Sequence, residues 1–303
     1  MRFAVIGLGS MGRNHYRILR TLSDVKLVAV CDPHFGGSYP ERMYGDVEQL
    51  LREEELDAAI VSVPTVLHRE IAVKVADHGV GLLLEKPVAP TISQALEIKA
   101  AVEANHVAAA VGHVERFNPV VTSLLRELKD KEIYSISITR VGPIPPRIKD
   151  VGVLVDLSVH DIDLVHLISR GAEVLESRVF KSVKVAGEHE DNAVITMRLE
   201  NDTVATIITN WLTPFKKRMI EVATDTAYYE ADLISQKLHE YSEYKASNSF
   251  RVRECPVEMN EPLQNEIAAF VRYLSGSDRG CLATIDDGIR TLQLIHKARA
   301  QSI

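Results

Sequence analysis

An aspartate and a histidine four residues apart are the first candidates for chemistry. Asp156 and His160 lie in the segment Asp156-Leu-Ser-Val-His-Asp-Ile-Asp163. Residues at this spacing share one face of a helix, and a histidine beside a carboxylate titrates near neutral pH and can accept a proton. A polar helix surface with one ordinary ion pair fits the same spacing, so the pair alone does not decide its role. A metal site would need more ligands at fixed spacing, and none is predicted.

Lys86 is the second candidate. It stands in Glu85-Lys86-Pro87, directly after the apolar run Gly81-Leu-Leu-Leu84. Packing explains a charged pair at the end of a buried strand poorly, because lysine is almost never fully buried without a partner. At the carboxyl edge of a parallel sheet, Lys86 would point into a ligand crevice. We therefore predict a functional Lys86.

A glycine-rich turn, Gly7-Leu-Gly9-Ser-Met-Gly12, indicates dinucleotide binding. It follows the apolar run Phe3–Ile6 and precedes residues with helical spacing, so a strand ends and a helix begins there. Gly7 permits a tight turn, Gly9 lets a pyrophosphate approach the backbone, and Gly12 lets the helix pack on the strand. The free N–H groups of the helix start would face the phosphates.

Asp32 directly follows the next predicted strand, twenty residues beyond Gly12. An acidic residue there accepts hydrogen bonds from ribose hydroxyls and repels a 2′-phosphate, so NAD is predicted over NADP. The turn Ser62–Thr65 follows another predicted strand and would lie at the carboxyl edge of the sheet, where it could contact the cofactor. A proline that simply ends the strand before a helix explains this turn equally well. The predicted cofactor contacts are Gly7, Gly9, Ser10, Met11, Gly12, Asp32, Ser62, Pro64, Thr65, His68, Glu85 and Lys86.

These residues need a fold to position them, and the pattern of the chain predicts two domains. Residues 1–110 alternate strands, at 2–6, 26–31, 57–63, 80–84 and 107–111, with helices at about 11–22, 46–53, 66–78 and 92–104, which is typical of a doubly wound parallel sheet. After residue 132 strand-like runs dominate, with helices at about 154–169, 262–274 and 286–300, which indicates a mainly antiparallel sheet. We predict an α/β Rossmann domain at 1–117 and an α+β substrate-binding and oligomerisation domain at 118–303, with the last helix free to pack back on the first.

Bulk properties exclude several classes of protein. The net charge of −7 argues against nucleic-acid binding, and no apolar run approaches the ~20 residues of a membrane span. The three cysteines lack metal-binding spacing and fit a reducing compartment. A strand from residue 2 leaves no room for a signal peptide, so a cytoplasmic protein is expected. A broad sheet with one uncovered face predicts a homodimer or homotetramer.

Together the glycine turn, Asp32, Glu85-Lys86-Pro87 and Asp156-x-x-x-His160 resemble the Gfo/Idh/MocA family of nicotinamide-dependent sugar and inositol oxidoreductases, over essentially the whole chain. The resemblance implies that Lys86, Asp156 and His160 converge near the nicotinamide, with the substrate between the domains. Oxidation of a secondary alcohol removes a hydride and a proton. His160 would accept the proton, Asp156 would orient it, and Lys86 would hydrogen-bond the substrate oxygen.

The segment Gly112-His-Val-Glu-Arg-Phe-Asn-Pro119 narrows the resemblance. Many members have Gly-Phe-Asn-Arg-Arg-Phe-Asp-Pro, so Val114 replaces an asparagine that contacts nicotinamide. This segment and Asn210–Lys216 resemble members that act on nucleotide sugars, in particular the UDP-N-acetylglucosamine 3-dehydrogenases, which act at C3. The substrate contacts that this implies are Lys86, His113, Arg116, Asn118, His160 and Lys216.

A UDP-sugar also needs cations for its diphosphate. The candidates are Arg116, Arg140, Arg147, Lys149, Lys216 and Arg218. Lys216 and Arg218 alternate on a predicted strand and would share one of its faces. A solvated strand edge, which carries cations to prevent aggregation, explains these two residues at least equally well. Two alternatives stay open: a dehydrogenase of free inositol or aldose, and a non-catalytic dinucleotide-binding sensor. An intact set of Lys86, Asp156 and His160 argues against the sensor.

Overall fold

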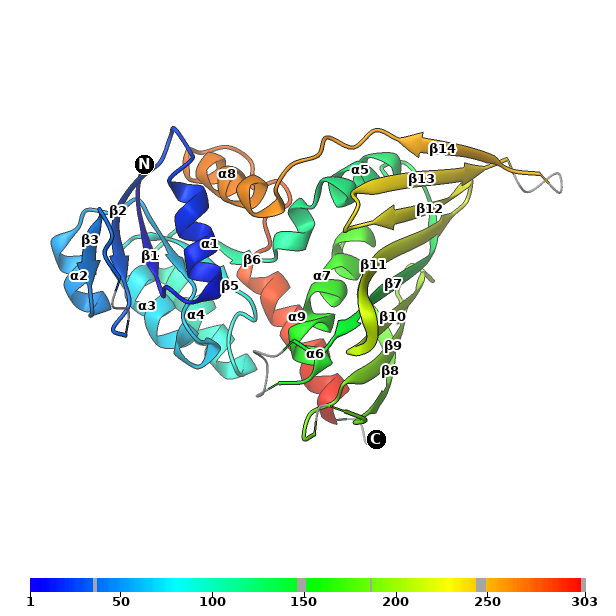
Figure 1. The fold of residues 1–303 in the computed structure, drawn as a ribbon, viewed down its shortest axis with the longest axis horizontal. Helices are drawn as coiled ribbons and strands as arrows, with labels where there is room; N and C mark the ends of the chain where they lie inside the picture. The colour runs from blue at the N-terminus through cyan, green and yellow to red at the C-terminus, as the bar shows by residue number, and fades with distance from the viewer. Residues whose placement is uncertain (35–36, 146–150, 186, 244–248, 301–303) are drawn as a thin grey trace. The chain divides into compact units, whose positions relative to one another are not determined.

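The computed structural model describes residues 1–34, 37–145, 151–185, 187–243 and 249–300 (Figure 1). The chain divides into two compact units. The first unit combines Met1–Val114 with Pro262–Leu292, and the second combines Glu115–Glu261 with Gln293–Ile303. The predicted fold class, a doubly wound parallel sheet followed by a mainly antiparallel one, is confirmed.

The first unit is built on a six-stranded parallel sheet in the order β3-β2-β1-β4-β5-β6. Its strands are β1 (Arg2–Ile6), β2 (Lys26–Cys31), β3 (Arg42–Tyr44), β4 (Ala58–Val61), β5 (Gly81–Glu85) and β6 (Ala109–Gly112). All residues of β4 and β5 are buried, as expected for strands that helices cover on both faces. The strand order reverses between β1 and β4, which is where open α/β sheets bind ligands at their carboxyl edge.

The helices of this unit follow the predicted strand–helix alternation. They are α1 (Ser10–Leu19), α2 (Val47–Glu53), α3 (His68–Asp77), α4 (Ile92–Ala104), α8 (Pro262–Leu274) and the part of α9 (Ile285–Ala300) up to Leu292. Phe270 of α8 packs edge-on against Phe3 of β1, with ring centroids 6.3 Å apart. Strand β3 was not predicted, because three residues are too few to show an alternating pattern.

The second unit is built on an eight-stranded sheet in the order β14-β13-β12-β11-β7-β10-β9-β8. Among the described strands only β7 and β10 pair in parallel. The strands are β7 (Ile133–Pro143), β8 (Val174–Ser182), β9 (Asn192–Leu199), β10 (Val204–Asn210), β11 (Leu212–Thr224), β12 (Ala227–Asp232), β13 (Lys237–Ser242) and β14 (Arg251–Cys255).

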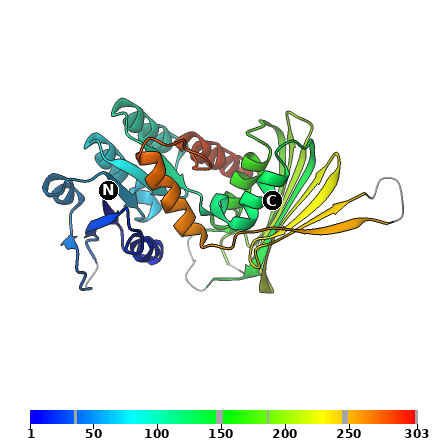
Figure 2. The ribbon, with the colours of Figure 1, turned by 90° about the horizontal axis from the view of Figure 1, so that it is seen from above.

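One face of this sheet is covered by α5 (Pro119–Glu127) and α7 (Ser158–Ile168), and the other face carries no helix in either view of the described chain (Figures 1 and 2). Alternate residues of β9, from Ala193 to Leu199, are therefore buried in the core. On the uncovered face Phe180 is 69% exposed and Ile208 is 37% exposed. Among the described residues, no helix is long and apolar enough to span a membrane.

The predicted helix at 154–169 is wrong as a single element. It consists of a short α6 (Val153–Asp156) and α7, which are separated at Leu157. The β-branched Val153 and Val155 favour helix interiors weakly, and Ser158 favours a helix start, so the local sequence supports a break. The backbone N–H of Val153 and that of Leu154 donate to Glu190, which fixes the start of α6 from another part of the chain.

Candidate active site

The glycine turn between β1 and α1 is tight at its ends and open at its middle. Gly7 has φ +91°, and a Cβ there would lie 2.7 Å from the backbone of Ser62. A Cβ on Gly12 would overlap the carbonyl oxygen of Gly7, whereas a Cβ on Gly9 would meet nothing within 4 Å. Helix α1 starts without a side-chain cap, which leaves its first N–H groups available to an anion. The turn therefore fits a pyrophosphate over Gly9.

Asp32 is fixed next to this turn. Its Oδ2 accepts a hydrogen bond from the backbone N–H of Leu8 at 2.8 Å, and its Oδ1 accepts one from the N–H of His34 at 2.9 Å. A carboxylate has about four acceptor positions. Asp32 can therefore hold the end of β2 against the turn and still accept from ribose hydroxyls.

The turn after β4 supports the glycine turn from the other side. The hydroxyl of Ser62 donates to the carbonyl oxygen of Gly7 at 2.9 Å. Pro64 is exposed and Thr65 is half-buried in a short 3-10 helix (Thr65–Leu67). His68 is only 1% exposed, and each of its ring nitrogens lies within hydrogen-bond distance of a backbone carbonyl oxygen. Its contacts are therefore with the protein interior.

Lys86 follows β5 at the same carboxyl edge as the ends of β1, β2 and β4, and it is half-buried. Its neighbour Glu85 is buried, and Glu85 Oε1 lies 2.7 Å from Nε2 of His15. Burial acts to raise the pKa of Glu85, but the hydrogen bond and charge of His15, together with the charge of Lys86, outweigh it and lower the pKa. Glu85 is therefore an internal carboxylate.

In the second unit, Asp156 ends α6 and His160 lies in the first turn of α7. Both side chains are half-buried, so both remain accessible. The backbone N–H of His160 donates to the carbonyl oxygen of Leu157 at 3.1 Å. Leu157 alone separates the two helices, and its backbone, with φ −103° and ψ −55°, stays in the right-handed helical region.

Two buried ion pairs follow His160 along α7. Asp163 binds Arg116 with both oxygens, at 2.7 Å to Nε and 2.6 Å to Nη2. Asp161 accepts from Nε of Arg140 on β7 at 2.8 Å. The side chains of all four residues are at most 5% exposed. These pairs attach the turn of α7 that follows His160 to other parts of the unit.

Glu115 connects the buried Arg140 to a further arginine, Arg218. Its Oε1 lies 2.8 Å from Nη1 of Arg140 and 3.2 Å from Nη1 of Arg218. Burial acts to raise the pKa of Glu115, but the two guanidinium charges outweigh it and lower the pKa. Burial and the charge of Arg140 lower the pKa of Arg218, whose side chain is 38% exposed. An anion beside Arg218 would offset that repulsion.

Other predicted substrate contacts are less accessible. His113 is 2% exposed and Asn118 is 3% exposed. Asn118 caps α5 by accepting from the N–H of Val120, and it donates to the carbonyl oxygen of Leu233 at 3.0 Å. Lys216 is exposed on β11. The candidates Arg147 and Lys149 lie outside the described residues.

Sequence reasoning missed the partners that hold these residues. Asp161 and Asp163 were predicted only as part of the segment around His160, and no role was predicted for Glu115 or His15. The available signal was a set of charged residues within apolar segments, since charged groups in such segments are usually paired.

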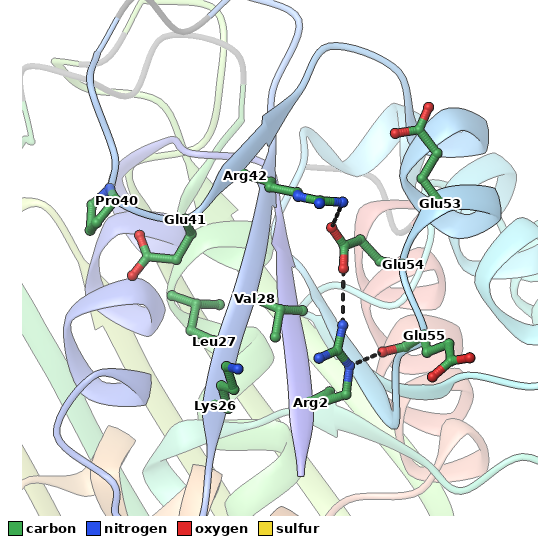
Figure 3. A pocket seen from close by; sticks show the side chains of 10 residues that line it. All are labelled: Arg2, Lys26, Leu27, Val28, Pro40, Glu41, Arg42, Glu53, Glu54 and Glu55. Carbon is green, nitrogen blue, oxygen red and sulfur yellow. Dashed lines mark hydrogen bonds and ion pairs between the residues drawn. The ribbon is translucent and has the colours of Figure 1, made fainter.

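A cleft of about 650 Å³ lies at the opposite, amino edge of the first sheet, at the starts of β1, β2 and β3 (Figure 3). Glu54 accepts there from Arg2 at 3.0 Å and from Arg42 at 3.2 Å. The lining residues are Arg2, Lys26, Leu27, Val28, Pro40, Glu41, Arg42, Glu53, Glu54 and Glu55. Glu54 pairs with two of its cations, and the cleft lies away from the carboxyl ends of the strands, where open α/β sheets bind dinucleotides.

One group of possible metal ligands stands among the described residues. Glu127, Glu240 and Cys255 come close enough to share an ion. Arg253 already binds both carboxylates, and burial raises the pKa of the Cys255 thiol to about 11. A guanidinium therefore neutralises the carboxylates, and the thiol stays protonated near neutral pH.

Comparison with known proteins places this chain among oxidoreductases. The profile of the "Oxidoreductase family, NAD-binding Rossmann fold" matches residues 1–113, and that of the "GFO/IDH/MocA C-terminal domain" matches residues 133–230. The UDP-N-acetylglucosamine 3-dehydrogenase of Acidithiobacillus ferrooxidans is 29% identical over 80% of this chain and 77% of that protein. The NAD⁺-dependent scyllo-inositol 2-dehydrogenase of Bacillus subtilis is 31% identical over 57% of this chain and 55% of that protein.

Solved structures agree with the sequence matches. The structure of UDP-N-acetylglucosamine 3-dehydrogenase GnnA from Acidithiobacillus ferrooxidans superimposes with a TM-score of 0.90 and 26% identity, over 99% of this chain and 96% of that one. Since family profiles match both the parallel-sheet and the antiparallel-sheet parts, the protein belongs to the Gfo/Idh/MocA family and is an NAD-binding oxidoreductase, a dehydrogenase acting on hydroxyl groups.

Proposed function

We propose that the protein oxidises a ring hydroxyl of a nucleotide sugar, UDP-N-acetylglucosamine at C3, with NAD as the oxidant. The observation that carries the proposal is the similarity to the Acidithiobacillus ferrooxidans enzyme, which extends over 80% of the chain in sequence and 99% in structure. The segment Gly112–Pro119 supports the same substrate class. The inositol dehydrogenases are a second candidate, favoured by the 31% identity to the Bacillus subtilis enzyme over a shorter stretch.

The proposed binding of NAD uses residues that fit it. The open space at Gly9 and the uncapped start of α1 suit the pyrophosphate, and Asp32 suits the adenosine ribose. A 2′-phosphate beside the Asp32 carboxylate would be repelled, so NAD should be preferred over NADP. Bound NAD supplies the hydride acceptor.

The proposed chemistry assigns one role to each of three residues. His160 accepts the hydroxyl proton as the alcohol becomes a ketone, and Asp156 favours the protonated imidazole that results. Lys86 donates a hydrogen bond to the substrate oxygen. The half-buried positions of all three are consistent with access to a substrate.

For the diphosphate we propose Arg218 and Lys216 as the main contacts. Arg218 is partly exposed, while Arg116 and Arg140 are buried in ion pairs with carboxylates. His113 and Asn118 are then supports of the site wall, because both are buried. We further propose a homodimer or homotetramer, in which a second copy covers the open sheet face around Phe180 and Ile208, and a cytoplasmic location.

A substrate screen tests this function. Reduction of NAD is followed by absorbance with UDP-N-acetylglucosamine, myo-inositol, scyllo-inositol and free N-acetylglucosamine, and the best substrate is repeated with NADP. We expect the highest kcat/KM with UDP-N-acetylglucosamine and NAD, and competitive inhibition by UDP. A higher kcat/KM with an inositol would establish the second candidate, and NAD binding without turnover of any of these substrates would favour a sensor.

A further inference from the structure

Two buried histidines hold the residues on either side of Lys86. The first is His15 of α1, which is fully buried and lies 2.7 Å from Oε1 of Glu85. The other oxygen of Glu85 accepts the backbone N–H of Lys86 at 3.2 Å. The Glu85 carboxylate thus ties the backbone of Lys86 to the helix that follows the glycine turn.

The second histidine is His68, at the start of α3. Its Nδ1 lies 2.9 Å from the carbonyl oxygen of Pro87, and its Nε2 lies 3.0 Å from the carbonyl oxygen of Val63. Pro87 follows Lys86 directly, and Val63 belongs to the turn after β4. Burial lowers the pKa of His68, and a neutral imidazole has one N–H, so His68 donates to one of these two carbonyl oxygens at a time. It lies between two loops at the carboxyl edge of the sheet, one of which carries Lys86.

Neither imidazole is explained by packing alone. A buried polar group costs free energy unless it is hydrogen-bonded, and an apolar side chain at position 15 would leave the buried Glu85 carboxylate without this partner. Neither reaches a ligand directly, because both side chains are enclosed. What they contact is the backbone or the carboxylate of the residues adjoining Lys86.

We propose that His15 and His68 are positioning residues for Lys86, holding residues 85 and 87 so that the lysine amine meets the substrate oxygen. The inference rests on the proposed role of Lys86 as hydrogen-bond donor. A lysine side chain has a flexible four-carbon stem, so a fixed backbone on both sides restricts where its amine can lie. A displacement of about 1 Å can cost about 10²-fold in rate.

The kinetic test is a double-mutant cycle on kcat. His15→Leu should lower kcat by about 10- to 100-fold with little change in the dissociation constant of NAD, and His15→Gln, which retains an N–H donor, should recover part of the loss. In a Lys86→Ala background His15→Leu should have almost no further effect, because the group that it positions is gone. Losses that multiply in the double variant, or a loss confined to NAD binding, would overturn the proposal.

A second test needs no substrate. Lysine amines are labelled by reductive methylation with ¹³C-formaldehyde, and the Lys86 signal is identified by its absence in Lys86→Arg. His68→Gln and His15→Gln should shift or broaden that signal more than any other lysine signal. His78→Gln is the matched control, because this half-exposed histidine bonds a carbonyl at the far end of α3, about 15 Å from His68.

The two tests separate this inference from the proposed function. An unperturbed Lys86 signal in both His15→Gln and His68→Gln overturns the positioning role, whatever the enzyme oxidises. A perturbed Lys86 signal in a protein that does not oxidise UDP-N-acetylglucosamine retains the positioning role and rejects the substrate.

Discussion

Replacement of Asp163 by asparagine should destabilise the second unit more than any change at an exposed ion pair. The Asp163 carboxylate binds Arg116 through two bonds of 2.7 and 2.6 Å, and the two side chains are 2% and 5% exposed. Breaking a buried pair from one side costs about 3–5 kcal/mol, since the remaining charge stays in a poorly solvated place. We expect about 3 kcal/mol for Asp163→Asn, because asparagine retains the volume and one acceptor oxygen.

Glu176→Gln provides the matched control. Glu176 pairs with Arg178 in the same unit at 3.3 Å, but the side chains are 51% and 73% exposed. An exposed pair is worth about 0–1 kcal/mol. The two variants thus make the same chemical change, from carboxylate to amide, and differ in burial.

Trp211 supplies the assay, because it is the only tryptophan in the sequence and is 5% exposed in the second unit. Urea unfolding followed by its fluorescence should shift to a lower midpoint by about 1 M or more for Asp163→Asn, given a slope of about 1–3 kcal/mol per M. The reasoning fails if Asp163→Asn lowers the unfolding free energy no more than Glu176→Gln does.

Three further outcomes are expected. Gly9→Ala should leave the melting temperature unchanged, because the added methyl group meets no protein atom, but it should abolish NAD binding measured by calorimetry, because the methyl group occupies the space proposed for the pyrophosphate. Gly12→Ala should also lower the melting temperature, because its methyl group overlaps a backbone oxygen of the turn. Equal melting curves for the two variants would contradict this prediction. Because the pKa of Glu115 is lowered in the folded protein, the unfolded chain takes up this proton at a higher pH than the folded protein does. The stability that the Glu115 carboxylate contributes is therefore complete above its ordinary pKa of 4.5 and is lost as pH falls toward the folded-state pKa. Glu115→Gln should flatten the decline of the unfolding free energy at acid pH, and an unchanged slope would refute this prediction. His160→Ala should lower kcat by about 10²-fold or more, and retained activity would reject His160 as the proton acceptor. Asp156→Asn should move the acid limb of the kcat/KM profile to lower pH, and an unmoved acid limb would reject the proposed effect of Asp156 on His160.

The carboxyl edge of the first sheet was predictable because its signals are local. The glycine turn, Asp32 and Lys86 each follow an apolar run of four to six residues, and the strand–helix rhythm places such positions at one edge. Helix α5 also had a readable start, because Asn118 caps it and Pro119 occupies its first position, yet it was not predicted. Strand β13 was not predicted either, and the structure shows that it pairs along its whole length with β12.

The partners of the site residues were not predictable, because they are distant in sequence. Asp163 and Arg116 are 47 residues apart, and Glu85 and His15 are 70 apart. Helical or strand periodicity reports the face on which a residue lies, but not which element packs there. The start of α6 likewise depends on Glu190, which binds it from another segment.

The most direct test of the central claim is transfer of isotope from the sugar. The enzyme is incubated with NAD and UDP-N-acetylglucosamine that carries deuterium on C3, and both products are analysed by mass spectrometry. Oxidation at C3 predicts that the deuterium appears in the reduced cofactor and is absent from the oxidised sugar nucleotide. Reduced cofactor without deuterium would show that another position is oxidised, and absence of reduction would show that this sugar nucleotide is not the substrate.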